Sequence, residues 1–435
     1  MNKLDICKLI IHSLKEFIAT PDKMEAFREP KCFVRNRKLS MLNLIYFLLF
    51  NGKSALQGSI SAVRDMLCDT TGFPNKLSKQ AVSKARKGLS YKLFLMLFSL
   101  SVDMFYANIN ERKKWHGYHI FAIDGSKIEL PNSKDNFDHF GEMFDSHNRD
   151  RKFTQALTSI VYDVLDDFIV HATFSHYLAS ERCQALNHMK ELEDLNIYKD
   201  AIIVFDRGYY SEKMFRYCVD HDHLCVMRLK DSIGLAKRLE KSDADSYEGM
   251  DVILGNPKEG TTDVTVRVIA VKLDSGATEY LATNIFDENI TSSMFRELYF
   301  LRWPCETKYY ELKVISLLEE FSSATPNSIM QEFYISLLIT NLSSLVKANA
   351  DEEIKTRSRS TNKYQYQANR TFIIGRMRKL FIKIITGISE MTVIDTLLED
   401  AYHSRSQIQP NRKDKRDKKK GKLRTHMRNR KAMPI

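Results

Sequence analysis

Two aspartates occupy equivalent places in the chain, each directly after a short apolar run with the length of a buried β-strand. Asp124 follows Tyr118–Ile123 (YHIFAI), and Asp206 follows Ala201–Phe205 (AIIVF). In open α/β sheets functional side chains gather at the carboxyl ends of the strands, because a rigid strand aims them into the crevice there. A carboxylate in this place is stabilised by a cation or by hydrogen bonds to a turn, so each aspartate alone is also explained by an Asx turn or a helix cap.

A third acid, Glu306, stands in a segment whose charged and phenolic side chains share one helical face. Along YFLRWPCETKYYELK, four side chains at offsets of 0, 3, 7 and 14 fall within roughly 60° of one face at about 100° per residue: Tyr299, Arg302, Glu306 and Lys313. An exposed face on which Glu306 pairs with Arg302 would give the same pattern. Pro304 interrupts a continuous helix, so Tyr299 and Arg302 are expected before a kink or at a new helix start.

From Tyr118 onward the pattern changes to strands that alternate with helices. Gln155–Val164 and Phe168–Phe174 are predicted to form a hairpin, and helices are predicted at Glu181–Leu195 and Ser211–Val219, on either side of the second buried run. Strands followed by a helix and a further buried strand indicate an α/β layer with a mixed sheet.

Short strands and then long helices follow. The strands are predicted, from alternation and apolar runs, at Leu224–Leu229, Val264–Leu273 and Glu279–Thr283. The helices are predicted at Ser292–Glu320, with the break at Pro304, at Ile329–Lys347 and at Tyr366–Ile385.

Residues 1 to about 110 are predicted to be helical, and one short helix among them is basic. In KLSKQAVSKARKGLS, Ser78 is a candidate N-cap, and basic side chains line much of the helix after it: Lys79, Lys84, Arg86 and Lys87. A short basic helix after the turn Gly72–Asn75 is typical of a helix-turn-helix that reads DNA. A solvated charged helix face has the same pattern.

The three acidic motifs, taken together, resemble the DDE transposases of bacterial insertion sequences in order and in spacing. The motifs are strand–Asp124–Gly–Ser, strand–Asp206–Arg–Gly–Tyr and Tyr299-x2-Arg302-x3-Glu306-x6-Lys313. The last resembles the Tyr–Arg–Glu–Lys signature of one large group of these enzymes. The resemblance extends over residues 75–320, and it implies a ribonuclease-H-like core interrupted by a β-rich insertion before the helix of Glu306.

The resemblance also implies roles for the residues. Asp124, Asp206 and Glu306 are the expected catalytic acids, and they would hold Mg²⁺ or Mn²⁺, two ions about 4 Å apart in a two-metal mechanism. Hard cations prefer such carboxylate oxygens. Tyr299, Arg302 and Lys313 are expected to contact the DNA end. Arg207 is a weaker candidate for DNA contact, since a salt bridge explains it equally well.

One feature departs from that group, in which some members hold a flipped base on a tryptophan of the β-rich insertion. Here Trp115 and Trp303 both lie outside the predicted insertion, so Tyr247 or Tyr280 would have to stack instead. The sequence therefore leaves open whether cleavage passes through a DNA hairpin intermediate.

Composition and charge set the outer limits. Of the 435 residues, 43% are hydrophobic and 28% charged, which excludes disorder of the whole chain. Seven cysteines without a CxxC pair argue against a disulfide framework or zinc finger and favour a reducing compartment. No signal peptide is expected at the N-terminus. The apolar runs Met41–Phe50 and Leu93–Val102 are too short to span a membrane, which takes about 20 residues.

The net charge of +11 is concentrated near the C-terminus. Residues 412–431 hold 12 Lys and Arg against two Asp, whereas the rest of the chain holds 54 basic and 53 acidic residues. A run of this kind is disordered when free and attracts nucleic acid, although it could also serve only as a solubilising tail.

These observations predict a division into four parts. Residues 1–110 form a helical DNA-binding domain, 111–222 with 286–405 a ribonuclease-H-like catalytic domain, 223–285 a β-rich insertion, and 406–435 a basic disordered tail.

The predicted function is that of a bacterial cytoplasmic, nucleoid-associated transposase with no membrane partner. It would bind terminal inverted repeats as a homodimer, cleave double-stranded DNA at the ends and join them to target DNA. The alternatives are a metal-dependent nuclease or resolvase without strand transfer, and a non-catalytic DNA-binding repressor.

Overall fold

The computed structural model describes residues 1–35, 38–50, 52–53, 55–144, 152–231, 233–241, 249–255, 263–273, 276–358 and 363–408. Two compact units are formed, each from separate stretches of the chain. The helical unit comprises Met1–Asn110, Glu129–Gln155 and Glu311–Ile435, and the sheet unit comprises Glu111–Ile128 and Ala156–Tyr310. The basic tail, residues 412–431, lies outside the described residues.

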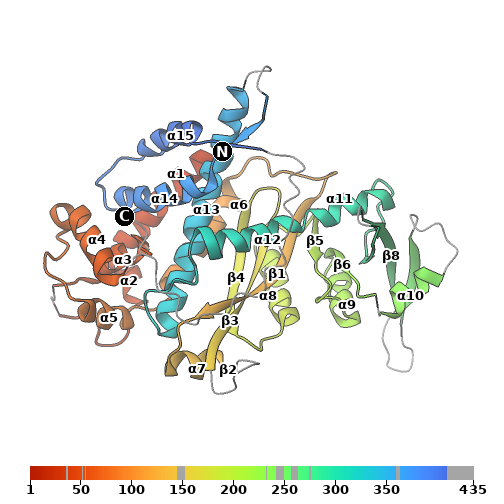
Figure 1. Cartoon of the computed structure of the whole chain (residues 1–435), viewed down its shortest axis with the longest axis horizontal. Helices are drawn as coiled ribbons and strands as arrows, with labels where there is room; N and C mark the ends of the chain where they lie inside the picture. Colours follow the sequence, from red (N-terminus) through yellow and green to blue (C-terminus); the bar gives the residue numbers. More distant parts are fainter. Residues whose placement is uncertain are drawn as a thin grey trace. The chain divides into compact units, whose positions relative to one another are not determined.

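The helical unit is built around the long helix α13 (Figure 1). Its elements are α1 (Lys3–Ala19), α2 (Pro21–Glu25), α3 (Met41–Phe50), α4 (Leu56–Thr71), α5 (Lys79–Lys87), α6 (Lys92–Asn108), α7 (Lys134–Phe140), β2 (Met143–Phe144), the π-helical turn η3 (Glu311–Ile315), α13 (Pro326–Thr356), β10 (Tyr366–Gln367), α14 (Arg370–Ile385), α15 (Val393–His403) and β11 (Ser406–Gln407). Helices α1, α3, α6, α14 and α15 all contact α13.

Helix α13 starts with Pro326 in its first turn, where the missing N–H of proline does no harm. By length and composition it could cross a membrane, but its most apolar window is entirely buried within the unit, as expected of a central core helix. The helix predicted at Ile329–Lys347 is therefore confirmed and is longer at both ends.

A buried ionic cluster joins α5 to α13. Glu332 on α13 accepts a hydrogen bond from Arg86 Nη2 on α5 at 2.9 Å and another from Lys53 Nζ at 3.1 Å, and these side chains are at most 5% exposed. Arg86 also donates to Gln331 Oε1 and to the Ser328 carbonyl, both at 2.8 Å. Burial alone would raise the pKa of Glu332, but the two cations and a hydrogen bond from Ser322 lower it to about 2.

This cluster changes two expectations. Arg86 does not line the exposed basic face of α5, because its guanidinium turns inward to the carboxylate of Glu332. A boundary between the compact units does fall after Asn110, but residues 1–110 do not form a unit alone, since they share a core with α13 and α14. At the other end, Ser406 and Gln407 pair with β10 instead of beginning the tail.

The sheet unit contains a mixed sheet in which β1, β5 and β6 run parallel. Its strands are β1 (His119–Leu130), β3 (Lys152–Asp163), β4 (Phe168–His176), β5 (Ala201–Phe205), β6 (Leu224–Arg228), β7 (Met250–Leu254), β8 (Val264–Lys272) and β9 (Thr278–Thr283), in the spatial order β4-β3-β1-β5-β6-β9-β8-β7. The last two residues of β1 and the first four of β3 belong to the helical unit. The prediction of an α/β layer with a mixed sheet is confirmed.

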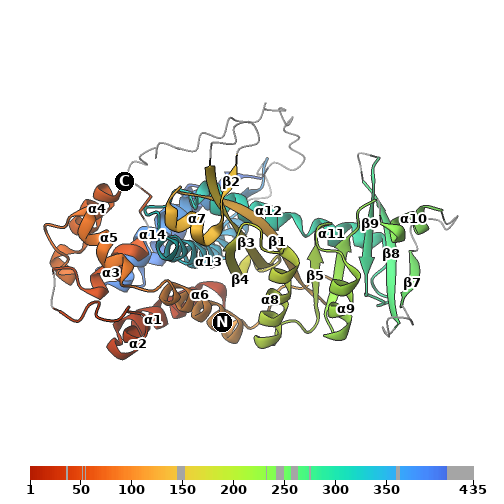
Figure 2. The same cartoon turned by 90° about the horizontal axis from the view of Figure 1, so that it is seen from below.

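Helices lie on both sides of these strands in Figure 2, with α8 and α9 on one side and α11 and α12 on the other. Their bounds are α8 (Glu181–Asp194), α9 (Glu212–Asp220), α10 (Gly234–Lys241), the 3₁₀ turn η2 (Ser292–Met294), α11 (Phe295–Phe300) and α12 (Trp303–Tyr310). Serine N-caps start α8 and α9, with the Ser180 and Ser211 side chains accepting from backbone N–H groups.

The strands of the predicted β-rich insertion continue the central sheet. β6 pairs in parallel with β5, and β9 pairs antiparallel with β6, so no break in the sheet separates residues 223–285 from the parallel strands. The predicted boundary at 222 thus falls before a strand of the central sheet, because β6 has the same apolar character as β1 and β5.

We expect Glu332→Gln to destabilise the helical unit by about 3 to 5 kcal/mol, because it leaves two buried cations without a counter-charge. The carboxylate has a lowered pKa, so its contribution is full above its ordinary value of 4.5 and is lost as the pH falls toward 2. Urea unfolding at pH 7 measures the loss. The control is Glu399→Gln on the surface of α15, where the fully exposed pair with Arg357 should contribute little to stability. Equal effects of the two variants would contradict this account of the cluster.

Candidate active site

The register of the parallel strands brings the two aspartates together. β1 and β5 are paired from His119 and Ala201 up to Ile123 and Phe205, so Asp124 and Asp206 each follow the last paired residue of neighbouring strands. The prediction that Asp124 ends its strand is wrong, because β1 continues to Leu130. Only the pairing of β1 with β5 ends at Ile123, and this places the carboxylates of Asp124 and Asp206 at the same edge of the sheet.

The carboxylate of Asp124 is partly buried and held from two sides. Its Oδ1 accepts from the N–H of Gly125 at 2.9 Å, and its Oδ2 lies 3.8 Å from Arg302 Nη1. Burial raises the pKa of Asp124 to about 6, against the lowering effects of Arg302 and the Gly125 N–H, and the charges of Asp206 and Glu306 raise it further.

Helix α12 carries Glu306. Two later residues of the same helix, Lys308 and Tyr309, bind it to the strands. Lys308, buried, forms an ion pair with Asp167 at 2.7 Å, in the turn between β3 and β4. The hydroxyl of Tyr309 donates to the backbone carbonyls of Asp124 at 2.9 Å and Thr158 at 3.2 Å. Glu306 itself stays half exposed, where its carboxylate can meet a ligand.

Arg302 stands between the acids. Its guanidinium is 4% exposed, donates to Glu306 Oε1 at 2.7 Å and approaches Asp124 at 3.8 Å. Among the described residues its Nε–H has no hydrogen-bond partner. It also lies over the ring of Tyr299, 5.8 Å from the centroid. Arg302 thus balances the acids and retains one buried donor for a further acceptor.

Tyr299 and two residues that the sequence analysis missed surround Asp206. Tyr299 Oη donates to Asp206 Oδ1 at 3.2 Å. Arg228 Nη1 lies 4.0 Å from the same oxygen, and Arg228 Nη2 pairs with Glu279 at 2.8 Å. Because Met227 pairs with Phe205, Arg228 follows the last paired residue of a third parallel strand. The available signal was a charged residue that ends a third apolar run, LCVMR.

The segment from Tyr299 to Lys313 does not form one helical face. Tyr299 lies on α11, Arg302 lies in the turn before α12, and Glu306 lies on α12, so the break expected near Pro304 is confirmed. Lys313 belongs to the helical unit, in the turn η3, where burial lowers its pKa and Glu319 and Glu129 oppose that effect.

The donor set fits hard divalent cations in its chemistry. Asp124, Asp206 and Glu306 supply carboxylate oxygens only, which Mg²⁺ and Mn²⁺ prefer. Within the part of the chain that the structure describes, no three His, Cys, Asp or Glu side chains are already arranged as a metal site.

Comparison with known proteins identifies the family. The family model of the transposase DDE domain matches residues 115–342, more than half of the chain. The chain belongs to the DDE transposase family. The resemblance seen in its motifs is thereby confirmed at the level of the family.

Two individual proteins are similar to this DDE transposase. InsZ of Escherichia coli (strain K12), whose name assigns it provisionally to the transposases, is 24% identical over 140 residues, which are 32% of this chain and 45% of InsZ. The match therefore spans less than half of InsZ. A cryo-EM structure of the piggyBac transposase in a synaptic complex with hairpin DNA is similar at a TM-score of 0.48 and 10% identity, over 96% of this chain and 87% of that one.

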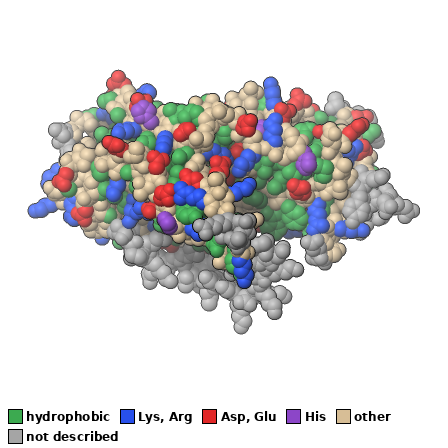
Figure 3. All heavy atoms as spheres, turned by 90° about the horizontal axis from the view of Figure 1, so that it is seen from above, with side chains coloured by type: hydrophobic (Ala, Val, Ile, Leu, Met, Phe, Trp, Pro, Cys, Tyr) green, Lys and Arg blue, Asp and Glu red, His purple; other side chains and the backbone are tan. Residues whose placement is uncertain are grey.

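The remaining predicted DNA-contact residues of this transposase lie on its surface. Arg207 is exposed and forms no ion pair with any described residue. Lys79, Lys84 and Lys87 are exposed on α5. On the face shown in Figure 3, Lys and Arg side chains are interspersed with Asp and Glu side chains, in keeping with the nearly balanced charge outside residues 412–431.

The aromatic candidates divide by exposure. Trp115 is buried and donates to Glu297 at 2.9 Å, whereas Trp303 is 45% exposed next to Arg302. Tyr280 is half-buried on β9, and Tyr247 lies outside the described residues.

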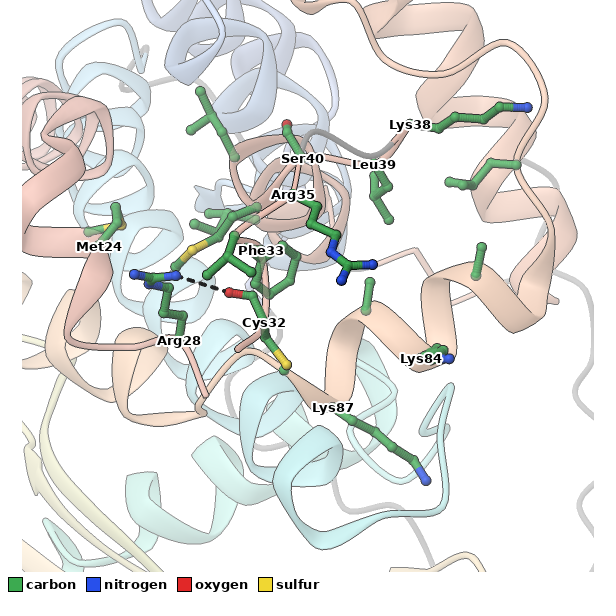
Figure 4. A pocket seen from close by; sticks show the side chains of 18 of the residues that line it. Met24, Arg28, Cys32, Phe33, Arg35, Lys38, Leu39, Ser40, Lys84 and Lys87 are labelled. Atoms are coloured by element: carbon green, nitrogen blue, oxygen red, sulfur yellow. Dashed lines mark hydrogen bonds between the residues drawn. The ribbon is translucent and has the colours of Figure 1, made fainter. Parts of the chain in front are cut away.

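A large groove in the helical unit has a mainly apolar lining that also carries eight cations and one acid, Glu25. It has a volume of about 2090 Å³ and a lining that includes Arg28, Lys31, Arg35, Lys38, Arg64, Lys76, Lys84 and Lys87. Figure 4 shows Arg35 and Lys38, from the segment before α3, across the groove from Lys84 and Lys87 on α5. Two of the three predicted α5 lysines therefore border an opening suited to an anionic ligand.

We expect Asp124→Asn to stabilise the metal-free protein at pH 7.5. The pKa of Asp124 is raised from 3.8 to about 6, so the ionised group reduces stability above pH 6, by at most about 3 kcal/mol. This penalty fades as the pH falls from about 6 to 4, where the folded protein binds the proton. Asparagine removes the charge and can still accept the Gly125 N–H.

Thermal melts in the presence of EDTA at pH 7.5 and pH 4 check this expectation. The variant should melt at a higher temperature than the wild type at pH 7.5 and at nearly the same temperature at pH 4. A gain that persists unchanged at pH 4, or a loss at pH 7.5, would show that burial of the charge is not the cause.

Proposed function

We propose that this chain binds the terminal inverted repeats of an insertion sequence, cleaves the DNA ends and joins them to target DNA. One observation carries the proposal: in a chain of the DDE transposase family, Asp124 and Glu306 both contact the buried Arg302, and Asp206 is hydrogen-bonded to Tyr299 beside it. In this proposal the sheet unit is a ribonuclease-H-like catalytic core, and the protein acts in a bacterial cytoplasm on nucleoid DNA.

The three carboxylates would hold two Mg²⁺ or Mn²⁺ ions, and when bound these ions would activate the attacking oxygen and stabilise the leaving oxygen. Each chemical step is an in-line attack on a phosphodiester, first by water and then by the freed 3′-OH. The acids supply negative charge only, so they attract cations and repel bare phosphate.

The side chains around the acids suit a phosphodiester as the ligand. Arg302 keeps an unpartnered Nε–H, and a guanidinium can donate several hydrogen bonds to phosphate oxygens. Tyr299 keeps the Asp206 carboxylate in place through its hydroxyl. We include Tyr299, Arg302, Lys313 and the exposed Arg207 among the contacts to the DNA end.

Binding of the duplex is proposed to involve α5 and its groove. Lys79, Lys84 and Lys87 are exposed, and the groove opens between α5 and the cations of the segment before α3. Backbone phosphates contacted by lysine release counterions, which gives binding that depends on salt but not directly on sequence. Two copies of the chain would hold the two ends of the element.

A cleavage and joining assay tests the function. With end-labelled terminal-repeat DNA, Mg²⁺ and a second duplex, the wild type should nick at the repeat ends and join the 3′ ends to the second duplex. Asp124→Asn, Asp206→Asn and Glu306→Gln should each lower cleavage at least about 1,000-fold, the scale of a missing group in an electrostatic catalytic site. DNA binding should persist in all three.

The outcomes separate the alternatives. Metal-dependent nicking without joining would identify a nuclease or resolvase. Repeat-specific binding with no nicking in Mg²⁺ or Mn²⁺ would identify a repressor. Full cleavage by Glu306→Gln would remove Glu306 from the catalytic acids.

A triple change of Lys79, Lys84 and Lys87 to alanine tests the α5 surface. We expect weaker binding of terminal-repeat DNA and a log–log salt slope smaller by about 1 for each lysine that binds a phosphate in the wild type. The matched control changes Lys92, Lys355 and Lys379, which are exposed on α6, α13 and α14 and do not line the groove. The same weakening in both triple variants would show that only net charge matters.

A further inference from the structure

A row of buried polar side chains in the sheet unit leads to the backbone of Asp124. His171 Nδ1 on β4 lies 3.0 Å from His188 Nδ1 on α8, and His188 Nε2 lies 3.0 Å from Ser159 Oγ on β3. Ser159 Oγ then donates to the carbonyl oxygen of Asp124 at 3.2 Å. His188 and Ser159 are fully buried.

The chemistry of the groups fixes the direction of every bond in this row. A carbonyl only accepts, so the Ser159 hydroxyl gives its hydrogen to Asp124 and can only accept from His188. His188 must then carry its hydrogen on Nε2, and its bare Nδ1 accepts from a hydrogen on His171 Nδ1. The His188 ring is therefore neutral, and burial lowers its pKa. Burial also lowers the pKa of His171 to about 4, so that ring is neutral near pH 7 as well.

A second donor reaches the same carbonyl from α12. Tyr309 Oη is 2.9 Å from the Asp124 oxygen, so this carbonyl accepts two side-chain hydrogen bonds, one from β3 and one from the helix of Glu306. The other end of the same peptide group is also engaged, since the Gly125 N–H donates to Asp124 Oδ1 at 2.9 Å.

The peptide between Asp124 and Gly125 is thus held at both ends, and one of those ends is the carboxylate itself. A peptide unit is planar, so fixing the direction of its C=O also fixes the direction of its N–H. We propose that Ser159, His188 and Tyr309 are positioning residues that set the orientation of the Asp124 carboxylate through this peptide. The inference rests on the proposed function, in which that carboxylate must face the cleavage site.

Packing alone does not call for these side chains. Helix α9, which also packs on the sheet, buries Met214, Phe215 and Cys218. Replacing a buried polar network with apolar residues is often neutral or stabilising. The presence of such a network beside Asp124 therefore favours a role in orienting the Asp124 carboxylate.

The test compares Ser159→Ala and Tyr309→Phe with Thr158→Val in the full chain. Each change removes one hydroxyl and nothing else of size. Thr158 is the matched control, because it is equally buried on the same strand, while its hydroxyl donates to the Thr173 carbonyl at 3.0 Å and not to Asp124. Thermal melts report any general loss of stability in all three variants.

Hydrogen–deuterium exchange at the Gly125 amide is the readout that a general packing role would not move. We expect exchange about tenfold faster in Ser159→Ala and in Tyr309→Phe, the effect of one weakened hydrogen bond, and no change in Thr158→Val. Equal exchange in the two test variants and the wild type, or equal acceleration in the control, overturns the inference.

Binding of Mn²⁺ without DNA separates this inference from the proposed function. We expect Ser159→Ala and Tyr309→Phe to bind Mn²⁺ about tenfold more weakly, Asp124→Asn to bind more weakly still, and Thr158→Val to match the wild type. Unchanged affinity in the two test variants beside a loss in Asp124→Asn overturns the inference. Unchanged affinity in Asp124→Asn overturns the metal role proposed for that acid, and the Gly125 exchange then decides the positioning role alone.

Discussion

Three carboxylates in one partly buried place repel one another and lose hydration, so the arrangement depends on positive charge beside them. In this chain that charge is Arg302, whose guanidinium contacts Asp124 and Glu306. The turn between α11 and α12 puts Arg302 there, because it lets Tyr299 reach Asp206 from one helix while Glu306 extends from the next. The break between the two helices at this turn is thus part of the site.

Much of the site could be predicted from local sequence. The aspartates follow apolar runs, and parallel pairing with register Ile123 to Phe205 brings such positions to one edge. The exact strand ends could not be predicted, since β1 continues past Asp124 although the apolar run ends at Ile123 and polar residues follow it. Arg228 was missed because an arginine after a strand is as often a surface residue, and only the pairing of β6 with β5 brings it to Asp206.

The helical unit shows the limit of reasoning from one helix at a time. Four cations on α5 have the same pattern in the sequence, yet Arg86 is buried while Lys79, Lys84 and Lys87 are exposed. The difference is decided by Glu332, which stands on α13 more than 240 residues away. Secondary structure was predictable for α8, β5 and α13, but the partners that bury their side chains were not.

The separation in sequence between α6 and α13 has a consequence for biosynthesis. Helices α1 and α6 rest their apolar faces on a helix that begins more than 200 residues after α6 ends. At 5 to 20 residues per second, about 12 to 50 s pass before the ribosome has made that helix. During this interval the buried face of α1, which includes Ile6, Ile10 and Leu14, lacks the contacts that α1 makes with α13. The sheet unit, complete at Tyr310, is therefore able to fold first.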